Sequence, residues 1–204
     1  MKVSPKSGFT LIELLVVITI IGILIGIAVP TIGSALDRAN QMKDLSNIKQ
    51  VGTLLFVNAN DNNGQFFKRG STTSEMFQEL WKDGGISSAA VLGGTGLSPI
   101  ENPDTSIPAE QIAWQYIKGL KTSSNANMSL LISYGPLTDV EGLTKKEGVN
   151  VSSFTAENSL WGDKVILAYY VGGNASRLTP KDTTVQFTQS DIAVDTSKVQ
   201  LLTR

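Results

Sequence analysis

The sequence has no cysteine and no histidine among its 204 residues. Their absence excludes disulfide bridges, Cys/His zinc sites, cysteine nucleophiles and every catalytic triad that depends on histidine. An excess of charge is missing too, because 17 Lys and Arg are balanced by 18 Asp and Glu. Such a balance provides no basic surface for nucleic acid, so we expect no nucleic-acid partner. No motif combines an acid, a base and a nucleophile, so we expect no enzymatic activity and no cofactor.

What the sequence has instead is one long apolar run, residues 9–29, in which 16 of 21 residues are apolar. As an α-helix this run is about 30 Å long, which matches the hydrocarbon core of a bilayer. Lys2 and Lys6 precede it and no acid does. The positive-inside rule then keeps the N-terminus in the cytoplasm and places the following chain across the membrane. We therefore predict a single-pass protein of the cytoplasmic membrane with an exported head.

Two simple interpretations of this run remain alternatives. A cleaved secretory signal has an apolar region of about 7–15 residues, which is shorter than this one, although residues 33–35 (GSA) offer a weak cleavage site. A plain membrane anchor fits the length but leaves Glu13 unexplained, since a carboxylate in hydrocarbon costs about 2.5–3.5 kcal/mol. Glu13 lies only four residues after Phe9, so in an uncut chain it is close enough to the interface to reach lipid headgroups.

A third interpretation explains more residues. The string GFTLIE at residues 8–13 resembles the type III signal of type IV pilins and type II secretion pseudopilins. The resemblance implies that a prepilin peptidase cleaves between Gly8 and Phe9 and that the same enzyme methylates the new amine. It also implies that Glu13 guides assembly with other pilin-like subunits, and that Gly22 and Pro30 are the helix-loosening residues of the family.

The physics of the charged and helix-breaking positions agrees with this interpretation. Opposite charges about 4 Å apart attract by about 4 kcal/mol at an effective dielectric constant of 20. Glu13 is unfavourable alone in lipid, and less so beside the Phe9 amine of a neighbouring subunit. Pro30 lacks an N–H and crowds the carbonyl of Gly26, so we expect the helix to bend or melt locally there.

Residues 30–58 are predicted to be the amphipathic second half of the same helix. An apolar residue recurs every three or four positions, as expected for one face of a helix that packs on a sheet. The residues of this stripe are Ile32, Leu36, Ala39, Met42, Leu45, Ile48, Val51 and Leu55. Charged residues, Asp44 among them, lie mostly between these positions. The helix is expected to stop in the segment 61–64 (DNNG), since Asn and Gly accept left-handed backbone angles. A free coiled coil is the alternative.

Residues 59–204 are predicted to be an exported α+β head. We expect a short helix over 75–82, capped by Thr73 or Ser74, and loops over 86–108. Strands are predicted over 113–117, 130–134 and 164–171, with a turn at 172–174 and a returning strand at 175–178. Two further short strands are predicted at 185–187 and 199–202. The fold class is therefore type IV pilin-like: one long N-terminal helix packed on a small antiparallel sheet with long loops.

The head also resembles a broad group of prepilin-like proteins with large heads. The similarity lies in LSNIKQVGTLLFVNANDNNGQF (residues 45–66), FQELWKDGG (77–85), WQYIKGL (114–120) and the late hairpin. In that group the late hairpin often has the pattern Phe-x-Asp-Gly-His-Val. Residues 169–175 stand there in this chain and contain neither Asp nor His, so any role of those two side chains does not carry over.

Other motifs in the head are weak. The segment 93–96 (GGTG) has neither the spacing nor the lysine of a phosphate-binding loop, and we expect a flexible loop. Asn127, Asn150 and Asn174 begin glycosylation acceptor patterns that Asn- and Ser-rich chains contain by chance. Some type II major pseudopilins bind calcium near the carboxyl end. The candidate ligands here are Asp182, Asp191 and Asp195, whose spacing favours solvated turns over a calcium loop.

Aromatic residues leave a similar choice open in the head. A binding platform would need exposed rings, whereas at this density core packing is the favoured prediction. The residues concerned are Trp81, Trp114, Trp161, Tyr116, Tyr169 and Tyr170.

The function predicted from the sequence is mechanical. The chain is expected to be a structural subunit of a type II secretion pseudopilus or a type IV pilus, ending in a filament in the periplasm or at the cell surface. The alternative is a minor pilin-like binding module whose head recognises a ligand or secreted substrate. A membrane-tethered enzyme is a third hypothesis without a supporting constellation of residues.

Overall fold

A computed structural model describes residues 8–124, 126–133, 160–161, 165–178 and 200–201 of the chain. Its contacts divide the chain into an N-terminal unit, residues 1–41, and a C-terminal unit, residues 42–204. Helix α1 (Leu11–Asp61) begins in the first unit and ends in the second. The two units are described separately below.

The N-terminal unit consists of the first part of α1. Its large apolar side chains are all exposed, from 46% for Val17 to 88% for Leu11 between residues 11 and 29. This part of the helix is long and apolar enough to cross a membrane by length and composition. Ile32 and Leu36 are exposed as well, so their predicted place in the buried packing stripe was wrong.

Helix α1 ends where turn-forming residues follow it. Asn63 has φ 56° and Gly64 has φ 73°, both in the left-handed region. The Gly64 N–H donates to the Ala59 carbonyl at 2.8 Å, which closes the last turn. The predicted stop at 61–64 is confirmed, and the helix continues three residues past the expected end near residue 58. The local backbone preference of Asn and Gly therefore determines where this helix ends.

The buried face of α1 in the C-terminal unit differs from the predicted stripe. Ile48, Val51 and Leu55 are fully buried, as expected. The prediction was wrong for Met42, which is 59% exposed, and for the charged Asp44, which is fully buried. These two residues lie about 200° apart around the helix, because each residue turns it by about 100°. Asp44 is four positions before Ile48 and shares its face.

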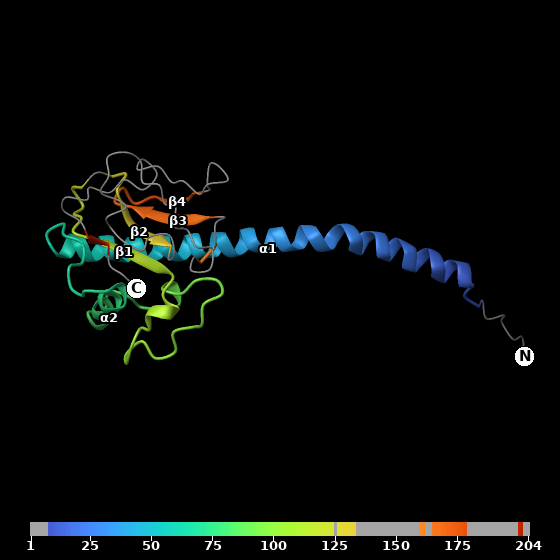
Figure 1. Ribbon diagram of the computed structural model, residues 1–204, viewed down its shortest axis with the longest axis horizontal. Coiled ribbons are helices and arrows are strands. Elements are labelled where there is room, and N and C mark those ends of the chain that lie inside the picture. Colours follow the sequence, from blue (N-terminus) through green and yellow to red (C-terminus); the bar gives the residue numbers. More distant parts are fainter. Residues whose placement is uncertain (1–7, 125, 134–159, 162–164, 179–199, 202–204) are drawn as a thin grey trace, which may run out of the picture. The chain divides into compact units, whose positions relative to one another are not determined.

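The C-terminal unit contains a five-stranded antiparallel sheet. Its strands are β1 (Trp114–Lys118), β2 (Ser129–Ser133), β3 (Ile166–Tyr170), β4 (Ala175–Leu178) and β5 (Gln200–Leu201). Their order is β4-β3-β2-β1-β5. Figure 1 shows β1 to β4 beside the second half of α1. The predicted pilin-like α+β fold and these five strands are confirmed within one or two residues, whereas the strand predicted at 185–187 lies outside the described residues.

Strands β3 and β4 form the predicted late hairpin. Ala168 pairs with Ser176 and Tyr169 pairs with Ala175. Gly173 has φ 82° in the connecting turn, where its N–H donates to the Tyr170 carbonyl at 2.9 Å. A residue with a Cβ rarely adopts this backbone angle, so the glycine suits the tight connection.

The aromatic residues of β1 belong to the core. Trp114 and Tyr116 are fully buried. The Trp114 indole Nε1 donates to the Val91 carbonyl at 2.8 Å, and the Tyr116 hydroxyl donates to the Phe67 carbonyl at 2.7 Å. Burial raises the pKa of Tyr116, so its hydroxyl stays protonated and remains a donor. For these two residues the core prediction is confirmed, and each also anchors a loop to the sheet.

Helix α2 (Thr73–Lys82) matches the predicted short helix but begins two residues earlier than predicted. Thr72 is the N-cap: its backbone is extended, and its hydroxyl accepts the Glu75 N–H at 3.1 Å. The prediction of Thr73 or Ser74 was wrong. Thr73 is helical and buried, and the Ser74 hydroxyl donates to a carbonyl of a later loop instead.

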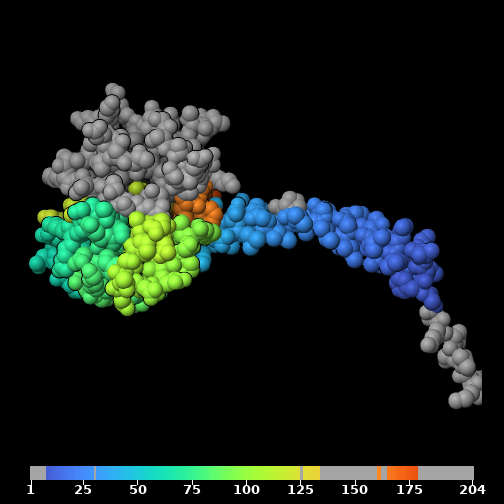
Figure 2. All heavy atoms as spheres, turned by 60° about the horizontal axis from the view of Figure 1, so that its bottom comes forward, coloured from blue at the N-terminus to red at the C-terminus, as the bar shows by residue number. Residues whose placement is uncertain are grey.

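The chain between α2 and β1 packs along α2. It holds two short 3-10 helices, η1 (Ala89–Val91) and η2 (Ala109–Gln111). The Trp81 Nε1 donates to the Asp104 carboxylate at 2.8 Å, and the Gln78 amide donates to the Pro103 carbonyl at 2.8 Å. Figure 2 shows these segments side by side on one face of the unit. Side-chain hydrogen bonds thus hold the long predicted loop against a helix.

Candidate functional site

The predicted processing junction lies just before α1. Gly8 has no non-neighbouring heavy atom within 4 Å of the place where a Cβ would stand. Phe9 is 76% exposed. The junction is therefore open to solvent on the described part of the chain, and its role in cleavage stays a prediction.

Thr10 and Glu13 form a reciprocal cap at the start of α1. The Thr10 N–H and hydroxyl both donate to the Glu13 carboxylate oxygen Oε2, at 2.8 and 2.6 Å. In return the Glu13 N–H donates to the Thr10 hydroxyl at 3.3 Å. This is a capping box, whose sequence signal is Thr followed three residues later by Glu. The capping role of Thr10 was not predicted, although the spacing of Thr10 and Glu13 is the signal that indicates it.

Glu13 is the single charged residue of the apolar run 9–29. Besides Thr10, the run has one other polar side chain, Thr19, whose hydroxyl donates back to the Leu15 carbonyl of the same helix at 2.8 Å. One carboxylate on an otherwise apolar, exposed helix is a position where a cationic partner has a large electrostatic effect.

The predicted helix-loosening residues lie inside α1. The helix continues through Gly22 and Pro30 without interruption. Gly22 has open space where a Cβ would stand. Their loosening role stays a prediction.

The weak candidate calcium ligands Asp182, Asp191 and Asp195 lie outside the described residues. Among the residues that the structure describes, no group of three or more Asp, Glu, His or Cys side chains is placed to hold a metal ion.

The buried Asp44 connects α1 to the segment 93–96. Its two carboxylate oxygens accept the Thr95 N–H at 3.2 and 3.1 Å. A Cβ on Gly94 would lie 2.8 Å from the Ala113 Cβ and 2.9 Å from Leu160. The segment is thus a tightly packed loop anchored on a carboxylate, and the prediction of a flexible loop was wrong.

The pKa of Asp44 is raised above its ordinary value. Burial is the main cause, because it disfavours the charged carboxylate. Hydrogen bonds from Thr95, a contact with the Trp161 indole and the charge of Lys43 act in the opposite direction and offset only part of the effect. Asp44 therefore costs the fold some stability when it is ionised. No local pattern in the sequence indicates that this carboxylate is buried.

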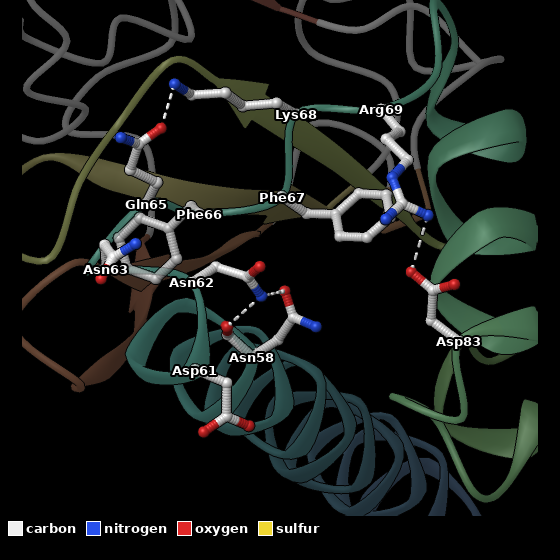
Figure 3. Close-up of a pocket in the computed structure, with 10 residues that line it drawn as sticks. All are labelled: Asn58, Asp61, Asn62, Asn63, Gln65, Phe66, Phe67, Lys68, Arg69 and Asp83. Atoms are coloured by element: carbon white, nitrogen blue, oxygen red, sulfur yellow. Dashed lines mark hydrogen bonds and ion pairs between the residues drawn. The ribbon is translucent and has the colours of Figure 1, made fainter.

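A polar cleft lies between the end of α1 and the end of α2. Its volume is about 330 Å³, and it is lined by residues 58, 61–63 and 65–69 and by Asp83. Figure 3 shows the Asn58 and Asn62 carboxamides on one side and the Arg69–Asp83 pair on the other. The Phe67 ring lies between the two groups. This cleft was not predictable from a local pattern, because Asp83 follows a separate helix.

Comparison with known proteins places the N-terminal segment in a known class. Residues 4–29 match the family described as the prokaryotic N-terminal methylation motif. The chain is 40% identical over 63 residues to the type II secretion system core protein G of Aeromonas hydrophila, covering 31% of this chain and 44% of the relative. It is 34% identical over 97 residues to the type IV major fimbrial protein FimA of Dichelobacter nodosus. This match covers 47% of this chain and 62% of the relative.

A third relative matches over a shorter segment. The type IV narrow pilus major component PilA5 of Thermus thermophilus is 65% identical over 35 residues, which cover 17% of this chain and 30% of the relative. The chain thus spans less than two thirds of each of these relatives. No solved structure matches it. The resemblance to the prepilin-type proteins of type IV pili and type II secretion, predicted from GFTLIE, is confirmed.

Proposed function

We propose that this chain is a structural subunit of a type II secretion pseudopilus or a type IV pilus. In this proposal residues 1–8 are a leader, 9–29 span the membrane, 30–58 are the second half of the helix, and 59–204 are the exported head. The observation that carries it is the exposed apolar surface of α1 with one carboxylate, Glu13, near its start. The relatives, named as pilus and secretion-system proteins, support the same role.

The proposed assembly mechanism follows from the N-terminal geometry. Cleavage after Gly8 by a prepilin peptidase creates a cationic amine on Phe9, and methylation retains the charge. Within one uncut chain the Glu13 carboxylate is bound to Thr10. In a filament it pairs with the Phe9 amine of a neighbouring subunit, which penalises any register that leaves either charge alone in an apolar surrounding. Stacked helices then push or display the heads, and no chemical step is required of them.

Processing is tested by intact mass and amino-terminal sequencing of the protein from a membrane fraction. We expect a chain that begins at N-methylated Phe9. Gly8→Leu, which puts a bulky side chain at the junction, should leave the uncut chain, whereas the adjacent Ser7→Ala should be processed normally. If the wild-type chain still begins at Met1, the segment is an uncleaved membrane anchor. If it begins near Leu36, the segment is a cleaved secretory signal, and the filament proposal is contradicted.

The charge of Glu13 is tested separately from processing. Glu13→Gln retains size and removes the charge, so we expect a chain that is cleaved and membrane-bound but missing from sheared filaments. Thr19→Val, which removes a hydroxyl from the same helix without changing charge, is the matched control and should assemble. Assembly of Glu13→Gln at the wild-type level would contradict the proposed pairing.

A minor, ligand-binding subunit is the second candidate function, and the polar cleft of the head is the observation that favours it. Abundance discriminates between the two, because a major subunit dominates sheared filaments and a tip binder is rare there. Cell fractionation distinguishes a filament in the periplasm from one at the cell surface.

A further inference from the structure

We propose that the polar cleft between the ends of α1 and α2 is a binding site for a neutral carbohydrate. The cleft belongs wholly to the C-terminal unit, so its geometry does not depend on the membrane-spanning part of α1. The proposal goes beyond the filament role, because assembly through α1 needs no ligand on the head.

The first argument is unused hydrogen-bonding capacity. Asn62 Nδ2 donates to the Asn58 carbonyl at 2.7 Å and to Asn58 Oδ1 at 3.3 Å. On the described part of the chain, no protein hydrogen bond uses Asn58 Nδ2, Asn62 Oδ1 or the second carboxylate oxygen of Asp83. The cleft therefore presents both donors and acceptors, and Figure 3 shows them around one space.

The second argument is that the polar groups are held in place before any ligand arrives. Arg69 Nη1 donates to Asp83 Oδ2 at 2.9 Å, and its guanidinium carbon lies 5.7 Å from the centroid of the Phe67 ring. Asn62 is fixed by its two bonds to Asn58. Side chains that are already ordered lose little conformational entropy on binding, which favours affinity for a small ligand.

The third argument is the local charge. Arg69 and Asp83 neutralise each other. Lys68 and Asp61 also line the cleft and carry opposite charges, and the Lys68 ammonium group is hydrogen-bonded to Gln65. With no net charge directed into the cleft, neither an anion nor a cation is favoured.

These properties together point to a polyhydroxylated ligand. A hydroxyl both donates and accepts, as does a carboxamide, so sugar hydroxyls match a neutral site of mixed donors and acceptors. The buried Phe66 and Phe67 rings give the cleft an apolar floor for the C–H groups of a sugar ring. A volume of about 330 Å³ lies at the lower end of the range for small-ligand sites.

The test is saturation-transfer difference NMR and calorimetry on the full chain in lipid nanodiscs, which contain no sugar detergent. The probes are cellotetraose, maltotetraose and the tetramer of N-acetylglucosamine, with inorganic phosphate and an acidic peptide as charged comparisons. We expect at least one neutral sugar to bind with a dissociation constant of about 1 mM or tighter. The affinity for the sugar should not change with added salt, because salt screens interactions between charges and a neutral sugar carries none.

Variants locate the binding. Asn58→Ala and Arg69→Met should each weaken the sugar about tenfold, the effect of losing one or two hydrogen bonds. The Arg69 side chain is 63% exposed, so its variant folds even if Asn58→Ala does not. Asn60→Ala, an exposed residue on the same turn of α1 outside the cleft, is the matched control and should bind normally.

Three outcomes would overturn the proposal. The first is that none of the three sugars shows saturation transfer at about 10 mM. The second is that a sugar binds but neither cleft variant weakens it. The third is that phosphate or the peptide binds more tightly than any sugar. None of them bears on cleavage after Gly8 or on Glu13, so failure here leaves the filament proposal standing.

Discussion

The ring of Tyr169 in β3 lies directly on Gly52 of α1. A Cβ at position 52 would be 2.3 Å from two carbons of that ring. Both residues are buried, Tyr169 to 2% exposure. The absence of a side chain at Gly52 is therefore what allows the sheet to approach the helix at this point.

Gly52→Ala is expected to destabilise the C-terminal unit. Overpacking a core costs about 1–3 kcal/mol, and the better helix propensity of alanine offsets up to about 1 kcal/mol of it. We predict a net loss of about 1–2 kcal/mol in the free energy of unfolding, measured by denaturant titration of the full chain in micelles. Gly33→Ala, in the same helix with open space around it, should leave this transition unchanged. Equal stability of Gly52→Ala and wild type would contradict the close contact.

Asp44 is expected to make stability dependent on pH in the acidic range. Its folded pKa is raised above the unfolded value, so the unfolded state gives up its proton first as the pH rises. The stability that Asp44 contributes to the folded state is therefore greatest below its pKa in the unfolded chain. It is lost as the pH rises through its pKa in the folded chain. Asp44→Asn keeps an oxygen for the Thr95 N–H and removes the charge.

The Asp44→Asn variant should thus be at least as stable as wild type at pH 7 and should lose the fall in stability that begins as the pH rises above the ordinary Asp pKa of about 4. Asp44→Ala leaves the Thr95 N–H without its acceptor and should be destabilised by about 1–3 kcal/mol. Thermal unfolding as a function of pH measures both. The exposed Asp37→Asn is the control, and a pH dependence that survives Asp44→Asn unchanged would argue against this origin.

Thr72→Ala should remove the N-cap of α2. The Thr72 hydroxyl accepts the Glu75 N–H, and loss of such a cap costs about 1 kcal/mol. Ser88 precedes η1 in the same capping position but makes no side-chain cap hydrogen bond. Ser88→Ala should therefore change the free energy of unfolding by less than about 0.5 kcal/mol. Chemical denaturation of the two variants distinguishes a bonded cap from an unbonded one, and equal losses would contradict the assignment of Thr72.

Thr10→Val should loosen the first turn of α1 in the uncut chain. It removes the hydroxyl that donates to Glu13 and accepts the Glu13 N–H. A lost cap of about 1 kcal/mol corresponds to roughly fivefold faster amide exchange in that turn. Hydrogen exchange in micelles measures the change, and Thr10→Ser, which keeps the hydroxyl, should exchange as wild type does. Unaltered exchange in Thr10→Val would show that the capping box does not form.

Local features of this protein were predictable from the sequence. The apolar run 9–29 needs no tertiary partner to be recognised, since its length and composition alone match a bilayer. The turn at Asn63 and Gly64 and the hairpin turn at Gly173 follow from backbone angles that these residues accept, wherever the chain lies. Strand positions were predictable within one or two residues for the same reason, because alternation and turn residues are local signals.

Relations between distant residues were decided only by the tertiary structure. The sequence pattern put Met42 on the buried face and Asp44 among the exposed charges. Packing of the loop at Thr95 on α1 selected the opposite arrangement, because a backbone N–H gives the carboxylate a partner there. The cleft likewise exists only where the end of α2 brings Asp83 to Arg69, 14 positions earlier in the chain. Hydropathy and turn propensity act over a few residues, whereas burial and cleft geometry depend on which segments meet.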